Sequence, residues 1–164
     1  MTLREYLESL AQEEIEEIHE PEERPELWVS FGLGGGVFGL PVHQVREVLR
    51  VGVITRVPRA PDSVRGVTNM RGRVLAILDL RVRMGLPRCE INDSSRILVA
   101  QGPSGPVGLL VDQVEQMEQV LPSAVQEPPD RLAAVSAFSR GVFPRDGSLM
   151  VLLELGSLLQ PTAA

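Results

Sequence analysis

The chain has 164 residues, with 16 basic residues that are all arginine, 22 acidic residues, two histidines and one cysteine. This length fits one folding unit or two small lobes that share a core, and 43% hydrophobic residues exclude wholesale disorder. No apolar run approaches the roughly 18 to 20 residues of a membrane span, and the acidic N-terminus does not resemble a secretory signal, so we expect a cytoplasmic protein without membrane insertion. The single Cys89 excludes an internal disulfide.

Negative charge is concentrated at the N-terminus. Residues 1–26 contain ten glutamates and two arginines, whereas residues 27–164 contain 12 acidic residues and 14 arginines. This change predicts an acidic extension, 1–26, followed by a domain, 27–160. We expect no nucleic-acid partner, because the arginines of the domain are spread through apolar sequence without interleaved aromatic residues.

The acidic extension has the pattern of an amphipathic helix. Thr2 and Glu5 form a capping box, apolar residues follow at steps of three and four, and Pro21 and Pro25 end the helix. The apolar residues are Leu3, Leu7, Leu10, Ala11, Ile15 and Ile18. Such a helix either packs against the domain or docks on a partner, and the sequence leaves both alternatives open.

The domain begins with a predicted β-hairpin. Apolar residues alternate along residues 27–33, glycines at 34–36 form a turn, and residues 37–40 return as a second strand. The glycines also fit the dinucleotide pattern G-x-G-x-x-G, but that pattern needs a helix to begin within it, whereas an extended segment follows. Residues 41–50 are predicted to form a short helix that begins at Pro41. Its apolar stripe is Val42, Val45, Val48 and Leu49.

The segment 54–87 contains the strongest candidates for binding residues. Gly66 and Gly72 permit unusual backbone angles, and Asn69 and Arg71 are predicted to lie on a loop framed by these glycines. The loop enters a strand at 74–80, whose apolar residues predict burial on both faces. A loop on a rigid scaffold commonly presents a binding side chain. Alternatively, Asn69 caps the turn and Arg71 pairs with a nearby acidic residue.

The rest of the chain predicts further short strands. We expect strands at 97–100 and 107–111, a hairpin of 139–143 with 149–155, an irregular loop at 122–136 and a short helix at 156–159. Residues 114–121 fit either an extended segment or a turn. Several short strands with frequent glycine turns favour small β-barrels.

The sequence lacks the usual enzyme signatures. It has neither G-x-S-x-G nor a Walker A motif, and no cysteine lies beside a candidate catalytic histidine. Asp62, Asp79 and Asp112 have no spacing that forces them together, and two distant histidines with one cysteine do not assemble a metal site. We therefore expect neither an enzyme nor a cofactor or metal, but an adaptor that acts through its surfaces.

From Leu27 to Leu159 the chain resembles the CheW-type coupling proteins of bacterial chemosensory systems. The matching segments, in order, are VREVLR, ITRVP, PDSVRGVTNMRGRVLAILDLR, GPVGLLVDQVEQM, SRGVF and SLMVLLEL. In the most specific block, GVTNMRG with VLAILDLR, Met70 replaces the usual leucine and Ala76 the usual proline. The resemblance implies a mainly β fold of two intertwined five-stranded SH3-like barrels, with a few short helices and a shared core.

The resemblance also implies a non-catalytic adaptor. Such a protein links the cytoplasmic tip of a methyl-accepting chemoreceptor to the regulatory domain of a CheA-type histidine kinase, at membrane-associated receptor arrays. The receptor tip is expected in a groove between the lobes, at Val45, Glu47, Val48, Asn69 and Arg71. Kinase contact is expected at Gly66 and Gly72 and on the other lobe.

The pathway stays open, since the acidic extension is longer and more charged than the family core requires. Flagellar chemotaxis and twitching or gliding motility are the alternatives that the resemblance allows. The alternative from another class is a stand-alone SH3-like peptide-binding module.

Overall fold

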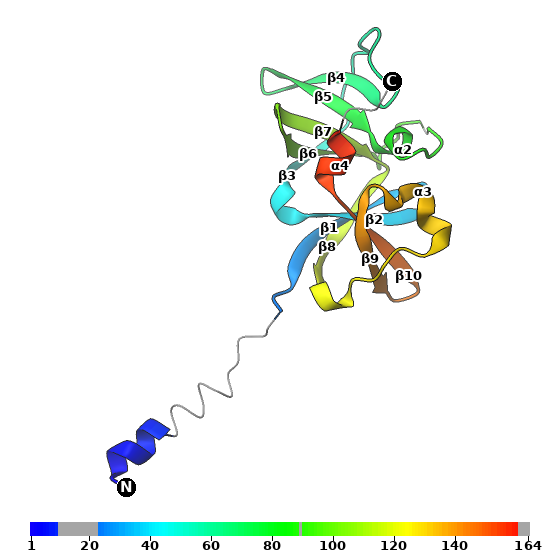
Figure 1. The fold of residues 1–164 in the computed structure, drawn as a ribbon. Coiled ribbons are helices and arrows are strands. Elements are labelled where there is room, and N and C mark those ends of the chain that lie inside the picture. The colour runs from blue at the N-terminus through cyan, green and yellow to red at the C-terminus, as the bar shows by residue number, and fades with distance from the viewer. Residues whose placement is uncertain (10–22, 89, 161–164) are drawn as a thin grey trace.

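The computed structural model describes residues 1–9, 23–88 and 90–160. In this part of the chain ten strands form two five-stranded sheets, which confirms the predicted mainly β fold (Figure 1). Lobe 1 has the strand order β8-β1-β2-β10-β9, and lobe 2 has the order β3-β6-β7-β5-β4. The strands are β1 (Glu26–Leu33), β2 (Gly36–Pro41), β3 (Val45–Arg50), β4 (Val64–Met70), β5 (Arg73–Asp79), β6 (Arg96–Gly102), β7 (Gly105–Val111), β8 (Gln113–Val120), β9 (Ser139–Arg145) and β10 (Ser148–Leu153).

Short helices connect the strands. They are η1 (Val42–Gln44), α2 (Leu80–Arg83), η2 (Pro122–Ala124), η3 (Asp130–Leu132), α3 (Ala133–Ser136) and α4 (Leu155–Leu159). The predicted C-terminal hairpin and terminal helix are therefore confirmed, as β9, β10 and α4. The predicted irregular loop at 122–136 instead contains η2, η3 and α3.

An internal repeat explains how the two lobes interleave. Strands β1–β5 and β6–β10 correspond in order: V-x-Q-V occurs at 42–45 and 111–114, and R-G-V at 65–67 and 140–142. Each lobe combines the first two strands of one repeat with the last three of the other. A parallel pair joins the two parts of each lobe, β2 with β10 in lobe 1 and β7 with β5 in lobe 2.

The largest apolar cluster is shared by the lobes. It joins Phe31 and Leu40 of lobe 1 to Leu98 and Leu109 of lobe 2, and all four side chains are fully buried. Smaller clusters lie within single lobes, around Trp28 in lobe 1 and Ile77 in lobe 2. Because burial of apolar area is the main favourable term in folding, the shared cluster makes the two lobes one folding unit.

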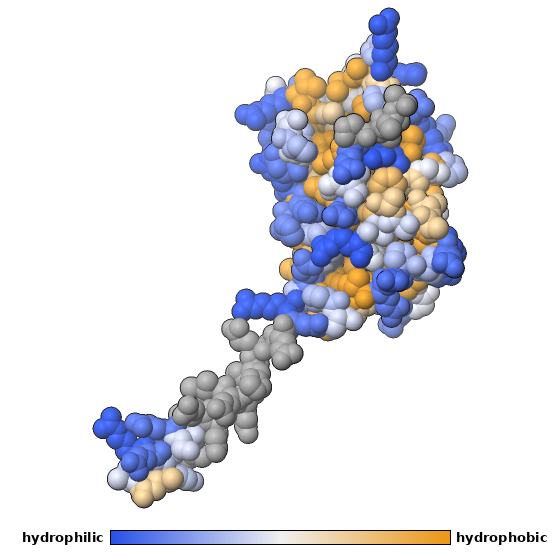
Figure 2. Space-filling model, viewed as in Figure 1, coloured by the Kyte–Doolittle hydropathy of each residue, from blue (hydrophilic) through white to orange (hydrophobic). Residues whose placement is uncertain are grey.

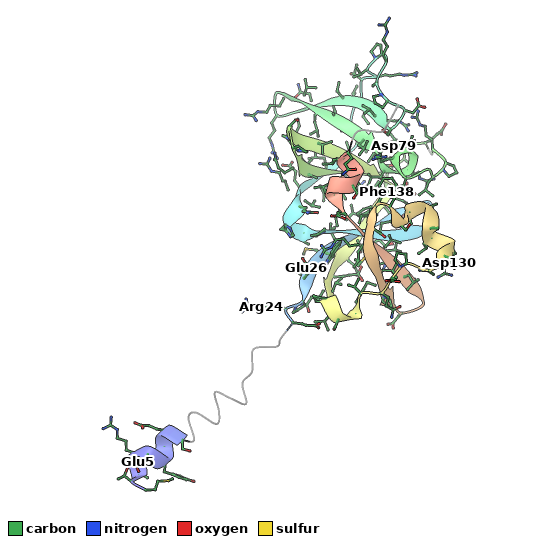
Figure 3. The ribbon with its side chains drawn as sticks, in the orientation of Figure 1. Glu5, Arg24, Glu26, Asp79, Asp130 and Phe138 are labelled. Atoms are coloured by element: carbon green, nitrogen blue, oxygen red, sulfur yellow. The ribbon has the colours of Figure 1, made fainter. Side chains whose placement is uncertain are left out.

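Arg83 of α2 adds polar contacts between the lobes. Its guanidinium donates to the carbonyl oxygens of Ser157, Leu158 and Gln160 at the C-terminal end of α4. It also lies over the ring of Phe138, 4.8 Å from the centroid. Phe138 lies where the two lobes meet (Figure 3). These carbonyls have no partner within their own helix, so Arg83 fixes α4 against lobe 2.

The predicted helix over residues 41–50 is wrong. Pro41 closes β2, Val42–Gln44 form the 3-10 turn η1, and Val45–Arg50 form the edge strand β3 beside β6. Half-buried and exposed residues alternate along β3, and Val48 is 45% exposed. The spacing of Val42, Val45 and Val48 fits a helical stripe, but pairing with β6 imposes a period of two.

The predicted burial of both faces of strand 74–80 is correct only for its second half. Residues 77–80 are buried in succession, whereas Val74 is 77% exposed and Ala76 is exposed. Near its turn, only one face of the β4–β5 hairpin packs on the core, so the other face leaves apolar side chains in solvent.

Of the acidic extension, residues 1–9 and 23–26 are described. Residues 3–9 are helical, the Glu5 N–H donates to Thr2 Oγ1 at 3.2 Å, and the Thr2 nitrogen donates to Glu5 Oε2 at 3.0 Å, which confirms the capping box. The predicted continuation through residues 10–18 and the stop at Pro21 lie outside the described residues, as does Cys89. Glu26 already pairs with Val120 in β1, so the extension ends at Pro25.

We expect a chain that lacks residues 1–25 to fold. The three apolar clusters of the domain contain none of residues 1–9, and the sheet begins at Glu26. The truncated and full-length chains should both unfold cooperatively on heating, with Tm values within about 4 °C, which corresponds to about 1 kcal/mol for a domain of this size. Loss of the cooperative transition would show that the extension completes the core.

Asp112 joins the two lobes where the chain leaves β7. Its carboxylate accepts from the Gly34 N–H of lobe 1 at 2.9 Å and from Arg81 of α2, with 2.7 Å between Arg81 Nε and Asp112 Oδ1. Burial raises the pKa of Asp112, but the hydrogen bonds from Arg81 and Gly34 and the charge of Arg81 together lower it below its ordinary value.

This pKa shift predicts how Asp112→Asn affects stability. A carboxyl whose pKa is lowered by folding contributes stability above its ordinary pKa and loses it as the pH falls through the folded-state value. We expect Asp112→Asn to lower the free energy of unfolding by about 2 kcal/mol at pH 7, the usual value of a hydrogen bond to a charged group. Urea unfolding should show a smaller difference at pH 3, and a difference independent of pH would contradict this role.

Candidate functional site

The β4–β5 hairpin ends in a strained two-residue turn. Arg71 has φ +52° and Gly72 has φ +80°, the left-handed region at both central positions of a type I′ turn. The Gly72 N–H donates to Asn69 Oδ1 at 2.8 Å, so Asn69 caps the turn. Glycine or asparagine adopts this conformation more easily than arginine, for which it costs roughly 1–2 kcal/mol. Strain of this kind is often kept at functional sites.

Arg71 reaches from this turn to the edge strand β3. Its Nη1 and Nη2 donate to the two carboxylate oxygens of Glu47 at 2.8 and 2.9 Å. The Arg71 side chain is 74% exposed and that of Glu47 26% exposed. An ion pair this exposed contributes at most about 1 kcal/mol, so it does not by itself explain an arginine in a strained position.

The ion pair borders a cleft of about 720 Å³, which we call the hairpin cleft. Its residues come from β3, the segment 51–55, the β4–β5 hairpin and Ile97, so it lies on lobe 2 alone rather than in a groove between the lobes. Val53 and Val74 line it and are 83% and 77% exposed. Exposed apolar side chains next to a bidentate ion pair form a surface suited to an amphipathic helix.

The residues predicted for receptor contact divide into two groups. Glu47, Asn69 and Arg71 line the hairpin cleft together. Val45 instead packs against the shared core, and Val48 is exposed outside the lining of the cleft. The sequence did not indicate Val53 or Val74. For Val74, an apolar strand gives no period that separates exposed from buried positions, and Val53 lies in a segment without regular secondary structure.

The two glycines predicted for kinase contact lie apart. Gly66 is buried in β4 with φ +151°, and a Cβ there would lie 2.3 Å from the Thr55 carbonyl oxygen. Backbone hydrogen bonds of 2.8 Å in both directions between Thr55 and Val67 hold this segment on β4. Gly66 therefore positions residues 54–55, whereas Gly72 belongs to the turn of Arg71.

Residues 27–162 match the CheW-like domain family. The chain belongs to this family. It is 37% identical to the chemotaxis protein CheW of Rhizobium meliloti over 131 residues, 79% of this chain and 84% of that protein. It is 32% identical to protein FrzA of Myxococcus xanthus over 140 residues, 84% of this chain and 88% of FrzA. The crystal structure of the scaffolding protein TtCheW from Thermoanaerobacter tengcongensis matches with a TM-score of 0.77 and 26% identity, covering 88% of this chain and 94% of that one.

Family membership fixes the general class of the protein. It is a CheW-type adaptor of chemotaxis or a related chemosensory pathway, with two SH3-like barrels. CheW proteins are non-catalytic scaffolds, so the prediction that the chain is not an enzyme is confirmed. Within the described residues, no helix is long and apolar enough to cross a membrane.

Proposed function

We propose that this protein couples the cytoplasmic tip of a chemoreceptor to a CheA-type histidine kinase at membrane-associated receptor arrays. Its receptor site is the hairpin cleft, and the observation that carries the proposal is the strained, exposed Arg71 beside Val53 and Val74. An amphipathic helix of the receptor covers the two valines, and its polar edge accepts hydrogen bonds from the Arg71 guanidinium. Asn69 supports this contact indirectly, because its side chain accepts a hydrogen bond from the Gly72 N–H and so stabilises the turn that carries Arg71.

The kinase regulatory domain binds at a separate surface, next to Gly66 and on lobe 1. The support for this assignment is the tight packing of Gly66 on Thr55, because it fixes a segment whose residues continue into an exposed loop, 56–62. Gly72 belongs to the receptor side, since it shares the turn of Arg71. Separate surfaces allow both partners to bind one molecule of the adaptor at the same time.

Binding to both partners distinguishes coupling from a stand-alone peptide-binding module. Immobilised receptor tip should retain this chain, and the retained chain should then retain the kinase regulatory domain. A control column without receptor tip should retain neither protein. If receptor tip and kinase domain compete for the chain, or if only one of them binds, the peptide-binding module is the better description.

A further inference from the structure

A second cleft lies on lobe 2, outside the hairpin cleft residues that carry the receptor proposal. It has a volume of about 860 Å³ and is formed largely by the loop between β3 and β4. Four arginines line it, Arg56, Arg59, Arg65 and Arg88, and we call it the arginine cleft. Its walls include the partly exposed apolar residues Val57 and Ile91. Hydrophilic side chains project from this end of the molecule in Figure 2, where Figure 1 places the β3–β4 loop.

The charges of this cleft are incompletely neutralised. Arg65 pairs with Asp79 at 3.2 Å, and Arg88 donates to the backbone oxygen of Asp62. Neither Arg56 nor Arg59 pairs with a carboxylate in the described part of the chain. Arg59 also has φ +64°, a conformation that a non-glycine residue adopts at a cost. A cleft with apolar walls and unneutralised arginines suits an acidic segment with apolar side chains.

The acidic extension has this chemistry. Residues 1–23 contain nine glutamates and one arginine. In the described helix, Leu3, Tyr6 and Leu7 are 74%, 52% and 56% exposed. The extension therefore carries an apolar face that nothing in the described structure covers, next to a large negative charge.

The charge of the two lobes favours lobe 2 as the docking partner. Residues 45–111, which contain lobe 2, carry 11 arginines and five acidic residues. Residues 26–44 and 112–160, which contain lobe 1, carry three arginines and eight acidic residues. The extension leaves the domain from lobe 1, which repels it, and lobe 2 attracts it.

The chain length allows docking within one molecule. Residues 10–25 separate the described helix from β1, and 16 residues span at most about 54 Å. Glu13, within this segment, is 13 residues from Glu26 and reaches at most about 44 Å. A domain of this size has a radius of gyration of about 14 Å, so both lobes are within reach. Attachment to the same chain also gives an effective concentration in the millimolar range, far above that of a second copy in a dilute sample.

We propose that the acidic extension docks on the arginine cleft of its own chain. Its glutamates neutralise Arg56 and Arg59, and its apolar face covers Val57 and Ile91. The proposal does not depend on the coupling function, but the arginine cleft includes the loop 56–62 that is proposed for kinase contact, so the kinase regulatory domain would have to displace a docked extension. A docked extension leaves this side of lobe 2 open only to partners that displace it.

A nitroxide label next to the cleft tests the proposal in the full-length chain. Cys89→Ser with Glu90→Cys places one label beside Arg88, and the label broadens amide NMR signals of residues that approach it. We expect signals of residues 3–18 to be lost at about 50 mM salt and to return at about 500 mM, because the Debye length falls from about 14 to about 4 Å. A label at exposed Ser148→Cys of lobe 1, also with Cys89→Ser and at the end of the sheet away from Glu26, should leave these signals visible.

Two variants and a mixing experiment decide the outcome. Arg56→Glu with Arg59→Glu should restore the signals, whereas Arg131→Glu, which changes an exposed arginine of lobe 1, should not. Replacing the four glutamates at 13, 14, 16 and 17 with glutamine should also restore them without altering the domain. Signals that stay visible at low salt, or stay broadened in both charge variants, overturn the proposal. Broadening between isotope-labelled and nitroxide-labelled molecules in a mixture would instead place the extension on a second copy and overturn docking within one chain.

Discussion

Replacing Arg71 with glutamate should abolish receptor binding while the domain stays folded. The substitution reverses a charge on a 74% exposed side chain at the edge of the hairpin cleft. Loss of a charge-assisted contact in an interface costs about 2–5 kcal/mol, so the Kd for receptor tip should rise at least about 30-fold. The free energy of unfolding should change by less than about 1 kcal/mol, since the lost ion pair is exposed. Titration calorimetry and urea unfolding measure the two quantities, and binding to the kinase regulatory domain should be unchanged.

Three further variants separate receptor contact from the pairing of Arg71 with Glu47. Glu47→Arg with Arg71→Glu restores an ion pair, but the turn no longer carries the guanidinium donors of Arg71. We therefore expect the double variant to bind receptor tip poorly. Arg71→Asn relieves the left-handed strain, and we expect it to be as stable as the wild type or more stable while binding receptor poorly. Glu47→Arg alone should give a weaker defect. If Arg71→Glu unfolds, or if the double variant binds normally, Arg71 has a structural role only.

Replacing Gly66 with alanine should have the largest effect on stability. The new Cβ would lie 2.3 Å from the Thr55 carbonyl oxygen and 2.8 Å from Ile54 Cγ2, so residues 54–55 must move away from β4. We expect a loss of about 2–4 kcal/mol in the free energy of unfolding, in the upper range for single substitutions. Binding to the kinase regulatory domain should weaken at temperatures where the variant is still folded.

Gly72→Ala is the matched control for this substitution. Gly72 also has a positive φ, but nothing lies within 4 Å of a Cβ at that position. We expect a cost of about 1–2 kcal/mol, from the backbone conformation alone, and normal kinase binding. A folded Gly66→Ala variant that binds kinase as the wild type does would remove the kinase surface from this part of lobe 2.

The sequence predicts most strands, but not the identity of β3. Helical spacing and strand alternation overlap at Val45 and Val48, and the pairing that decides between them involves β6, about 50 residues later. The internal repeat relates residues 42–51 to 111–120, and both segments form strands. Apolar residues at 111, 114, 117 and 120 have the same three-residue spacing as 42, 45 and 48, so the repeat does not resolve this ambiguity from sequence.

The candidate site was predictable only in part. Glycines around Arg71 indicate an exposed turn, and the structure places Arg71 there. Asn69 lies in β4 rather than in the predicted loop, and it caps the turn from that strand. The pairing of Arg71 with Glu47 crosses 24 residues and depends on how β3 and the β4–β5 hairpin lie at the edges of one sheet. The exposure of Val74 could not be predicted, because the local sequence does not encode which face of β5 packs on the core.

Kinase autophosphorylation tests the central claim, that this chain couples receptor to kinase. Purified CheA-type kinase is mixed with ATP and receptor tips held in a membrane-like array, and the phosphorylated kinase is measured with and without this chain. We expect the chain to raise phosphorylation only when receptor is present, the Arg71→Glu variant not to raise it, and the chain alone to hydrolyse no ATP. Equal phosphorylation with and without the chain, in a mixture where the wild-type protein binds both partners, would contradict it.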